Sequence, residues 1–224
     1  MSEQKKEHLI VANIGNNYSA RFLRSWTEFL ARCINDKVQV TLMQRAGIAN
    51  VHHARELLVS GDIFATKDKK VVPFGGREYD YVLWIDSDQI FSYDDYLRLK
   101  SHDLDVVSAA IRIAHEDDMF NCGMFDTKCL LKDGKIHAKL CEESVKDKVD
   151  PIEVGFVGFG FVLMKYGVFE KMEFPYFVSE KYEIPNLIGY TGEDTGWCTR
   201  AKKAGIKLYM DPLCRVLHEK VVAI

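Results

Sequence analysis

The chain has 224 residues, of which 47% are hydrophobic and 28% are charged, and its formal net charge at pH 7 is -3. This composition is typical of a folded globular protein of one ordinary domain and excludes an intrinsically disordered chain. The slightly acidic balance, without a basic stripe, argues against a nucleic-acid partner. No apolar stretch approaches the roughly 18 to 20 residues needed to cross a bilayer, and the polar start lacks a signal-peptide core. We therefore expect a cytoplasmic protein with no integral membrane segment.

The first half of the chain alternates strand and helix patterns. The predicted elements are a strand at 8–13, a helix at 22–33, a strand at 38–42, a helix at 48–60, a strand at 81–85, a helix at 93–102 and a strand at 105–111. The run 81–85 is almost wholly apolar, as expected for a central parallel strand that is covered on both faces. This alternation predicts the α/β class, with a mostly parallel central sheet flanked by helices.

The pattern changes after this point. A turn signal at Asp133-Gly134 predicts a small antiparallel ribbon within 119–140, and the charged stretch 142–150 predicts a loop. A glycine-rich apolar run at 154–164, a short helix, a proline-punctuated loop at 174–188, a helix at 193–204 and strands near 207 and 215 complete the predicted elements. We expect a single domain over 1–224, which is either the whole protein or one domain of a longer one.

The strand at 81–85 leads directly into Asp86-Ser87-Asp88, two carboxylates separated by one residue. Ligands of open α/β sheets bind at the carboxyl ends of strands. Carboxylate oxygens suit Mg²⁺ or Mn²⁺, which can bridge the phosphates of a nucleotide substrate. The alternative is an ordinary turn, because Asp and Ser commonly follow a strand.

Two later segments carry further candidate residues. Glu193 and Asp194 fall in the first turn of a predicted helix, where a carboxylate can act as general base toward an acceptor hydroxyl. Thr191 with Asp194 also resembles a capping box, and capping alone accounts for both acids. His218 ends a short apolar strand and is either structural or a metal ligand, since imidazole coordinates Mn²⁺-like ions.

The order of these segments adds information that none of them carries alone. The succession of DSD, the run GFVGFGF, GED on a helix and GIKLYMDPLCRVLHE resembles family 2 glycosyltransferases and related GT-A enzymes of the Mnn9 and Anp1 type. The resemblance covers roughly residues 8–219. It implies a GT-A (nucleotide-diphospho-sugar transferase) fold, Mn²⁺ or Mg²⁺ as cofactor, and a UDP- or GDP-sugar as donor. The acceptor would be a glycan, a protein or a lipid-linked molecule.

The same resemblance implies roles for individual residues. Asp88 and His218 would hold the metal, and Asp86 would face the ribose and also belong to the metal site. Asp194 would be the base of an inverting reaction, with Glu193 supporting the acceptor; a retaining reaction, in which Asp194 need not be a base, is the alternative. The residues implied at the nucleotide-sugar are Val11, Ala12, Asn13, Arg55, Asp86, Ser87 and Gly158.

Two of these assignments have structural alternatives, and three other functions stay open. Arg55 could be an exposed helical residue paired with a nearby acid, and Glu56 stands where the family has Asn. The run 155–161, which includes Gly158, could be a buried strand whose glycines serve packing.

The other functions are a nucleotidyltransferase, a hydrolase with an aspartyl nucleophile, and a catalytically inactive nucleotide- or glycan-binding module of the same fold. The turn after the first strand lacks the basic residue of a phosphate loop, which argues against the nucleotidyltransferase.

Overall fold

The computed structural model describes residues 6–113, 119–124, 139–184 and 187–219. Its centre is a seven-stranded sheet in the order β2-β1-β3-β10-β5-β13-β8. These strands are β1 (His8–Ile14), β2 (Gln39–Arg45), β3 (Tyr81–Asp86), β5 (Val106–Ala109), β8 (Ile152–Val154), β10 (Phe161–Lys165) and β13 (Leu208–Asp211). β1 pairs in parallel with β2 and β3, and β5 with β13, whereas β10 and β8 run antiparallel to their neighbours. The predicted mostly parallel α/β sheet is confirmed.

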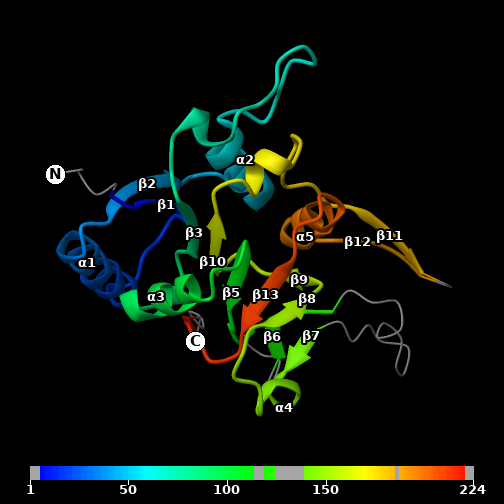
Figure 1. Ribbon diagram of the computed structural model, residues 1–224. Coiled ribbons are helices and arrows are strands. Elements are labelled where there is room, and N and C mark those ends of the chain that lie inside the picture. Colours follow the sequence, from blue (N-terminus) through cyan, green and yellow to red (C-terminus); the bar gives the residue numbers. More distant parts are fainter. Residues whose placement is uncertain (1–5, 114–118, 125–138, 185–186, 220–224) are drawn as a thin grey trace.

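Helices cover both faces of this sheet (Figure 1). They are α1 (Ala20–Asn35), α2 (Val51–Ser60), α3 (Tyr93–Ser101) and α5 (Glu193–Lys203), with the 3-10 turns η1 (Pro73–Gly76) and η2 (Phe169–Lys171). Successive strand side chains point to opposite faces. Thus Val11 and Ile85 pack with α1 and α3 in one apolar cluster, while Ala12 and Trp84 pack with α2 and α5 in the other. Burial on both faces explains why the central strands are apolar throughout.

Local signals fix where the helices begin. The Ser19 hydroxyl accepts a hydrogen bond from the backbone N–H of Phe22, and the Asn50 side chain caps α2 in the same way. Ser92 and Asp95 form a capping box at the start of α3. Such caps satisfy backbone donors that have no partner within the helix. α2 therefore begins at a defined position, directly beside the ends of β1 and β3.

The smaller sheets are all antiparallel. β6 (Met119–Gly123), β7 (Lys139–Cys141) and β9 (Phe156–Val157) form one, β4 (Gln89–Ile90) with β14 (Leu217–His218) a second, and β11 (Lys181–Ile184) with β12 (Leu187–Tyr190) a third. The β6–β7 pair confirms the predicted ribbon, although its expected turn at Asp133-Gly134 lies outside the described residues.

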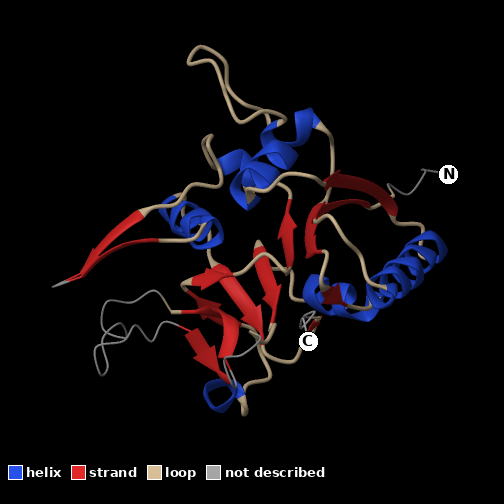
Figure 2. Ribbon diagram, turned by 180° about the vertical axis from the view of Figure 1, so that it is seen from behind, coloured by secondary structure: helices blue, strands red, loops and turns tan. Residues whose placement is uncertain are grey.

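Two loop predictions are wrong. The charged stretch 142–150 begins with a one-turn helix, α4 (Glu142–Val145). The expected loop at 174–188 contains β11 and the start of β12, whose strands pair with each other away from the central sheet (Figure 2). Ile188 and Tyr190 are 62% and 73% exposed, so no buried apolar run marked this hairpin in the sequence. In the part of the chain that the structure describes, no helix combines the length and apolar character that a bilayer crossing requires.

Candidate functional site

The candidate site lies where β1 and β3 end side by side. These parallel neighbours finish at the paired residues Ile14 and Asp86. The chain then turns through Ser87 and Asp88 into β4, and β14 pairs with β4 so that His218 lies opposite Gln89. Two segments separated by most of the chain are thereby brought together at the carboxyl edge of the sheet, where open α/β sheets bind ligands.

Asp88 and His218 are in direct contact. The imidazole Nε2 of His218 lies 3.0 Å from Oδ2 of Asp88, and the other ring nitrogen, Nδ1, lies 3.2 Å from the backbone carbonyl of Arg112. Because a carbonyl only accepts, Nδ1 is the donor to Arg112, which leaves Nε2 to face Asp88. The other Asp88 oxygen accepts a hydrogen bond from Gln89, and the Asp88 carbonyl accepts one from the backbone N–H of Glu219. The pair is therefore held from both sides, with Nε2 oriented toward the carboxylate.

Arg55 connects two of the predicted segments. Its Nη1 donates to Glu193 at 2.7 Å, and its Nη2 lies 3.3 Å from Asp86 Oδ1. The side chain is only 5% exposed and its guanidinium lies over the Phe159 ring, 5.1 Å from the centroid. The expectation of an exposed helical arginine is thus wrong, whereas pairing with acids is correct. A buried cation on α2 fixes the end of β3 relative to the start of α5.

His52 is a site residue that the sequence did not identify. Its Nε2 lies 3.3 Å from Glu193 Oε2, so Glu193 contacts His52 through one oxygen and Arg55 through the other. His52 and Arg55 are three residues apart on α2, and residues at this spacing share one face of a helix. The spacing of His52 and Arg55 was therefore the only sign in the sequence that they act together. It could not be interpreted without knowing that both contact Glu193.

Asp194 is oriented differently from its neighbour. Its Oδ1 accepts hydrogen bonds from the backbone N–H and hydroxyl of Thr195, and no side chain caps α5. The Thr191 hydroxyl instead accepts from the backbone N–H of Glu180, so the capping-box interpretation is wrong. Burial raises the pKa of Asp194; Arg55 lowers it and Glu193 raises it further, and the net shift is upward. A carboxylate with a raised pKa is a stronger base.

A cavity of about 460 Å³ opens at this edge. Its charged and polar lining consists of Asn16, Arg45, Arg55, Asp86, Ser87, Asp88 and Glu193, and Ile14, Gly15, Ile48 and Ala49 are among its other lining residues. Gly15 has a φ of +154° and packs directly on Ser87: a Cβ added there would lie 2.1 Å from the Ser87 hydroxyl oxygen. His218 lines a neighbouring cavity of about 570 Å³ together with Arg112 and Arg215.

The other predicted nucleotide-sugar residues lie less directly on this cavity. Val11 and Ala12 are fully buried, and Asn13, which is 4% exposed, donates to the Ile85 carbonyl. Val11 and Asn13 line a separate apolar cavity of about 210 Å³ beneath α1. Gly158 is buried, with its backbone N–H donating to the Asn121 carbonyl. Within the run 155–161, Gly160 contacts the Asp86-Ser87-Asp88 turn, because its carbonyl accepts from the Asp86 N–H.

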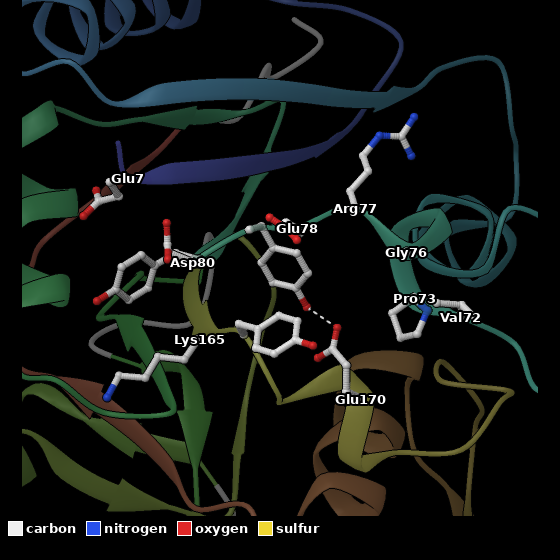
Figure 3. Close-up of a pocket in the computed structure, with 12 residues that line it drawn as sticks. Glu7, Val72, Pro73, Gly76, Arg77, Glu78, Asp80, Lys165 and Glu170 are labelled. Atoms are coloured by element: carbon white, nitrogen blue, oxygen red, sulfur yellow. Dashed lines mark hydrogen bonds between the residues drawn. The ribbon is translucent and has the colours of Figure 1, made fainter. Parts of the chain in front are cut away.

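The opposite edge of the sheet contains a different kind of cavity, of about 770 Å³ (Figure 3). Glu7, Asp80, Lys165 and Glu170 extend toward it. Glu170 accepts hydrogen bonds from the Tyr79 hydroxyl and the backbone N–H of Gly167. None of the sequence-predicted site residues lines this cavity, so we place the candidate chemistry at the carboxyl edge.

Comparisons with known proteins agree with the architecture. The sequence matches no protein-family model and no curated protein. Among solved structures, the chain is similar to A197 from STIV, with a TM-score of 0.52, 15% identity and 97% of each chain covered. It also matches GalNAc-T7, solved with UDP, GalNAc and Mn²⁺, with a TM-score of 0.46 and 14% identity, covering 97% of this chain and 44% of that one. The chain therefore spans less than half of GalNAc-T7.

The fold is thus the expected GT-A type, with its central sheet, flanking helices and small antiparallel sheet. At these identities the similarity shows the fold alone. Within the described residues, no group of three or more His, Cys, Asp or Glu side chains is arranged to hold a metal ion. Any argument for function therefore depends on the residues of the site themselves.

Proposed function

We propose that the chain is a metal-dependent glycosyltransferase that transfers a sugar from a UDP- or GDP-sugar to an acceptor hydroxyl, and that residues 1–224 form a single GT-A domain. The observation that carries the proposal is the position of Arg55, whose guanidinium contacts both Asp86 and Glu193. This contact brings the acidic strand end and the acidic helix start to one cavity, beside the Asp88–His218 pair. An ordinary strand-ending turn and an ordinary helix cap would have no reason to share one buried cation.

The residues present fit a divalent cation. A carboxylate oxygen and an imidazole nitrogen are both groups that would bind Mn²⁺ or Mg²⁺. Asp88 Oδ2 and His218 Nε2 are separated by 3.0 Å. Ions such as Mg²⁺ are commonly bound by one or two protein groups together with substrate phosphates and water, so a two-residue protein set suffices. A bound Mn²⁺ or Mg²⁺ would neutralise charge on the departing nucleoside diphosphate.

The protein groups around the cavity have separate tasks. Asp88 and His218 hold the ion, and the Arg45 and Arg55 side chains supply positive charge along the same cavity. Asp86 accepts from Arg55, which orients its carboxylate for a ribose hydroxyl. Gly15 permits the close approach of the first strand end to Ser87, which a larger residue would prevent.

Glu193 and Asp194, the two acids at the start of α5, have different surroundings and therefore different proposed roles. Glu193 contacts both Arg55 and His52, so its carboxylate is held in place and positions the acceptor. Asp194 contacts no cation as closely and has a raised pKa, which suits a base. Asp194 takes the acceptor hydroxyl proton as the acceptor oxygen bonds to the anomeric carbon and the bond to the diphosphate breaks. Direct displacement of this kind inverts the anomeric configuration.

The test measures donor binding and turnover in the same preparation. Thermal melting against UDP-, GDP-, CMP- and dTDP-sugars, with Mn²⁺ and with EDTA, identifies the donor, because a ligand of the folded state raises the melting temperature. Free nucleotide released from that donor then measures turnover. We expect both signals to need Mn²⁺ and to be lost in Asp88→Asn but retained in Asp147→Asn, which changes an exposed acid.

Two other outcomes of this test would contradict the proposed transferase activity. Metal-dependent binding of one donor without nucleotide release, across a panel of sugar and peptide acceptors, would identify an inactive binding module. No binding to any donor would overturn the proposal altogether.

A further inference from the structure

The segment 61–72, between α2 and η1, projects from the body of the protein. Figures 1 and 2 both show it as a long loop standing beyond the helices. None of its twelve residues belongs to a helix or a strand. Its length is close to the limit above which loops without secondary structure are uncommon in compact domains, and such loops are either functional or linker segments. This loop belongs to neither the cavity at the carboxyl edge nor the acidic helix start.

Its side chains combine one exposed aromatic ring with several cations. Phe64 is 79% exposed, the highest exposure among the large apolar side chains of the described residues. Lys67, Lys69 and Lys70 are exposed, and within the described part of the chain none of them has an ion-pair partner. Single exposed apolar side chains are common on protein surfaces, so the ring is informative only through its position beside three cations on one projection.

The loop has a defined shape that presents these side chains together. The backbone N–H of Phe64 donates to Asp62 Oδ1 at 3.1 Å, and the backbone N–H of Lys69 donates to the Thr66 carbonyl at 3.2 Å. These two turns hold the ring and the lysines on the same short projection. The base of the loop is anchored, because Val71 packs against the core.

We propose that the loop 61–72 docks on a membrane surface that contains anionic phospholipids, with Phe64 entering the headgroup boundary and Lys67, Lys69 and Lys70 attracted to the negative headgroups. Aromatic and basic side chains are the combination that binds this interface. A protein partner fits less well, because a standard protein interface buries about 800 Å² on each side and the loop offers a single exposed aromatic ring. The loop carries three cations against two acids in a chain whose net charge is -3, so its charge complements an anionic surface.

Docking through this loop has a geometric consequence for the rest of the molecule. The loop follows the end of α2, whose first turns carry His52 and Arg55, and it precedes the start of β3, whose far end carries Asp86. The loop and the 460 Å³ cavity thus lie at opposite edges of the sheet. A docked molecule would present its cavity away from the lipid. The inference does not depend on the proposed function, since it concerns different residues and a different readout.

Sedimentation with vesicles tests the proposal on the intact chain. We expect binding to phosphatidylcholine vesicles that contain phosphatidylserine and little binding to phosphatidylcholine alone, with binding weakened by added salt. Replacing Lys67, Lys69 and Lys70 together by Gln should lower the partition coefficient on the order of a hundredfold. Phe64→Ala should lower it about tenfold. Phe64→Trp should give a blue-shifted emission with the anionic vesicles only.

Matched variants exclude general effects of charge and apolarity. Lys146, Lys203 and Lys207 are 52%, 67% and 66% exposed, and their combined replacement by Gln removes the same charge from other surfaces. Ile34→Ala removes an apolar side chain that is 73% exposed on α1. Both controls should bind vesicles nearly as the unmodified chain does. The proposal would be overturned if the control variants lost as much vesicle binding as the loop variants, or if the chain bound both vesicle types equally. It would also be overturned if heparin displaced the chain from vesicles while Phe64→Ala had no effect on binding.

Discussion

Asp88 and His218 are 130 residues apart in the chain, yet their side chains lie 3.0 Å apart across the β4–β14 pair. Both side chains are partly exposed, at 37% and 19%, so their contact contributes under about 1 kcal/mol to folding. Because the contact contributes so little to folding, the proposed metal-binding role of this pair can be tested by substitution in a folded chain.

His218→Ala should accordingly affect ligand binding far more than folding. We expect the melting temperature without ligand to change little, whereas the Mn²⁺-dependent stabilisation by the donor disappears. At a donor concentration about 100 times the Kd, that stabilisation is about 2.7 kcal/mol. His53→Ala, which removes an exposed histidine of α2, is the control. A variant that melts much earlier but still binds donor with Mn²⁺ would assign His218 a structural role.

Arg55→Met should destabilise the fold, because it leaves the Asp86 and Glu193 carboxylates without their shared cation. Removing one partner of a buried ion pair costs about 3 to 5 kcal/mol; we expect about 2 to 3 kcal/mol here, because Asp86 and Glu193 are 29% and 17% exposed. Urea unfolding measures the change in free energy. Arg24→Met, which breaks an exposed pair with Glu28, should change the unfolding free energy far less.

A double-mutant cycle separates the contact from the rest of the substitution. Glu193→Gln removes one of the two negative charges, so combined with Arg55→Met it should cost less than the sum of the single changes. Strict additivity would mean that Arg55 does not stabilise the start of α5 through Glu193.

Gly15→Ala should disturb the acidic turn rather than the strand. A Cβ at Gly15 would lie 2.1 Å from the Ser87 hydroxyl oxygen, so Ser87 and the adjacent carboxylates must move. We expect a loss of about 1 to 3 kcal/mol in unfolding free energy and weaker donor binding. Gly167→Ala is the control, because Gly167 also has positive φ, +96°, with no atom within 4 Å of the added Cβ. If both variants bind donor equally well, the contact with Ser87 is not needed.

Much of the arrangement was predictable because it is local. The apolar run before Asp86, the helical period before Gly205 and the turn residues between elements each depend on neighbouring positions, so strands and helices were placed within a few residues. The convergence of Asp88, Glu193 and His218 on one edge was expected only from the resemblance, and the roles that it implies for them stay predictions.

Other features depend on which distant segments pair. β10 enters the sheet antiparallel between β3 and β5, and no local pattern states this order. The contact of His52 with Glu193 has the same origin, since it requires α2 and α5 to meet at the end of β3. The β11–β12 hairpin was missed because Ile188 and Tyr190 of β12 are exposed and mark no buried face in the sequence.

Asp194→Asn should abolish transfer while leaving donor binding intact. An amide cannot accept the acceptor proton, and loss of a general base lowers kcat by about 10² to 10⁴. The Asn side chain keeps an oxygen for the Thr195 N–H, so α5 should begin as before. The measurement compares nucleotide release with donor-induced melting shifts. Glu193→Gln is the informative neighbour: it should weaken acceptor use and keep a measurable rate. Loss of donor binding in Asp194→Asn would show that Asp194 supports the fold instead.

Asp211 should give the fold a distinct dependence on acid. Its side chain is fully buried, and it accepts from Arg98 at 3.1 Å, from His102 at 2.7 Å and from the backbone N–H of Leu213 at 2.8 Å. Burial alone would raise the pKa of Asp211, but the hydrogen bonds from Arg98, His102 and Leu213 outweigh it, and the net shift is downward. A carboxyl whose pKa is lower in the folded state stabilises that state fully above its unfolded pKa of about 3.9, and the benefit is lost as pH falls through the folded value. Unfolding free energies of the unmodified chain should therefore fall more steeply between about pH 5 and pH 2 than those of Asp211→Asn. The Asn variant should be less stable at pH 7, with the two curves converging in acid. Parallel curves over this range would mean that Asp211 has the same pKa in both states and that the Arg98 contact contributes little.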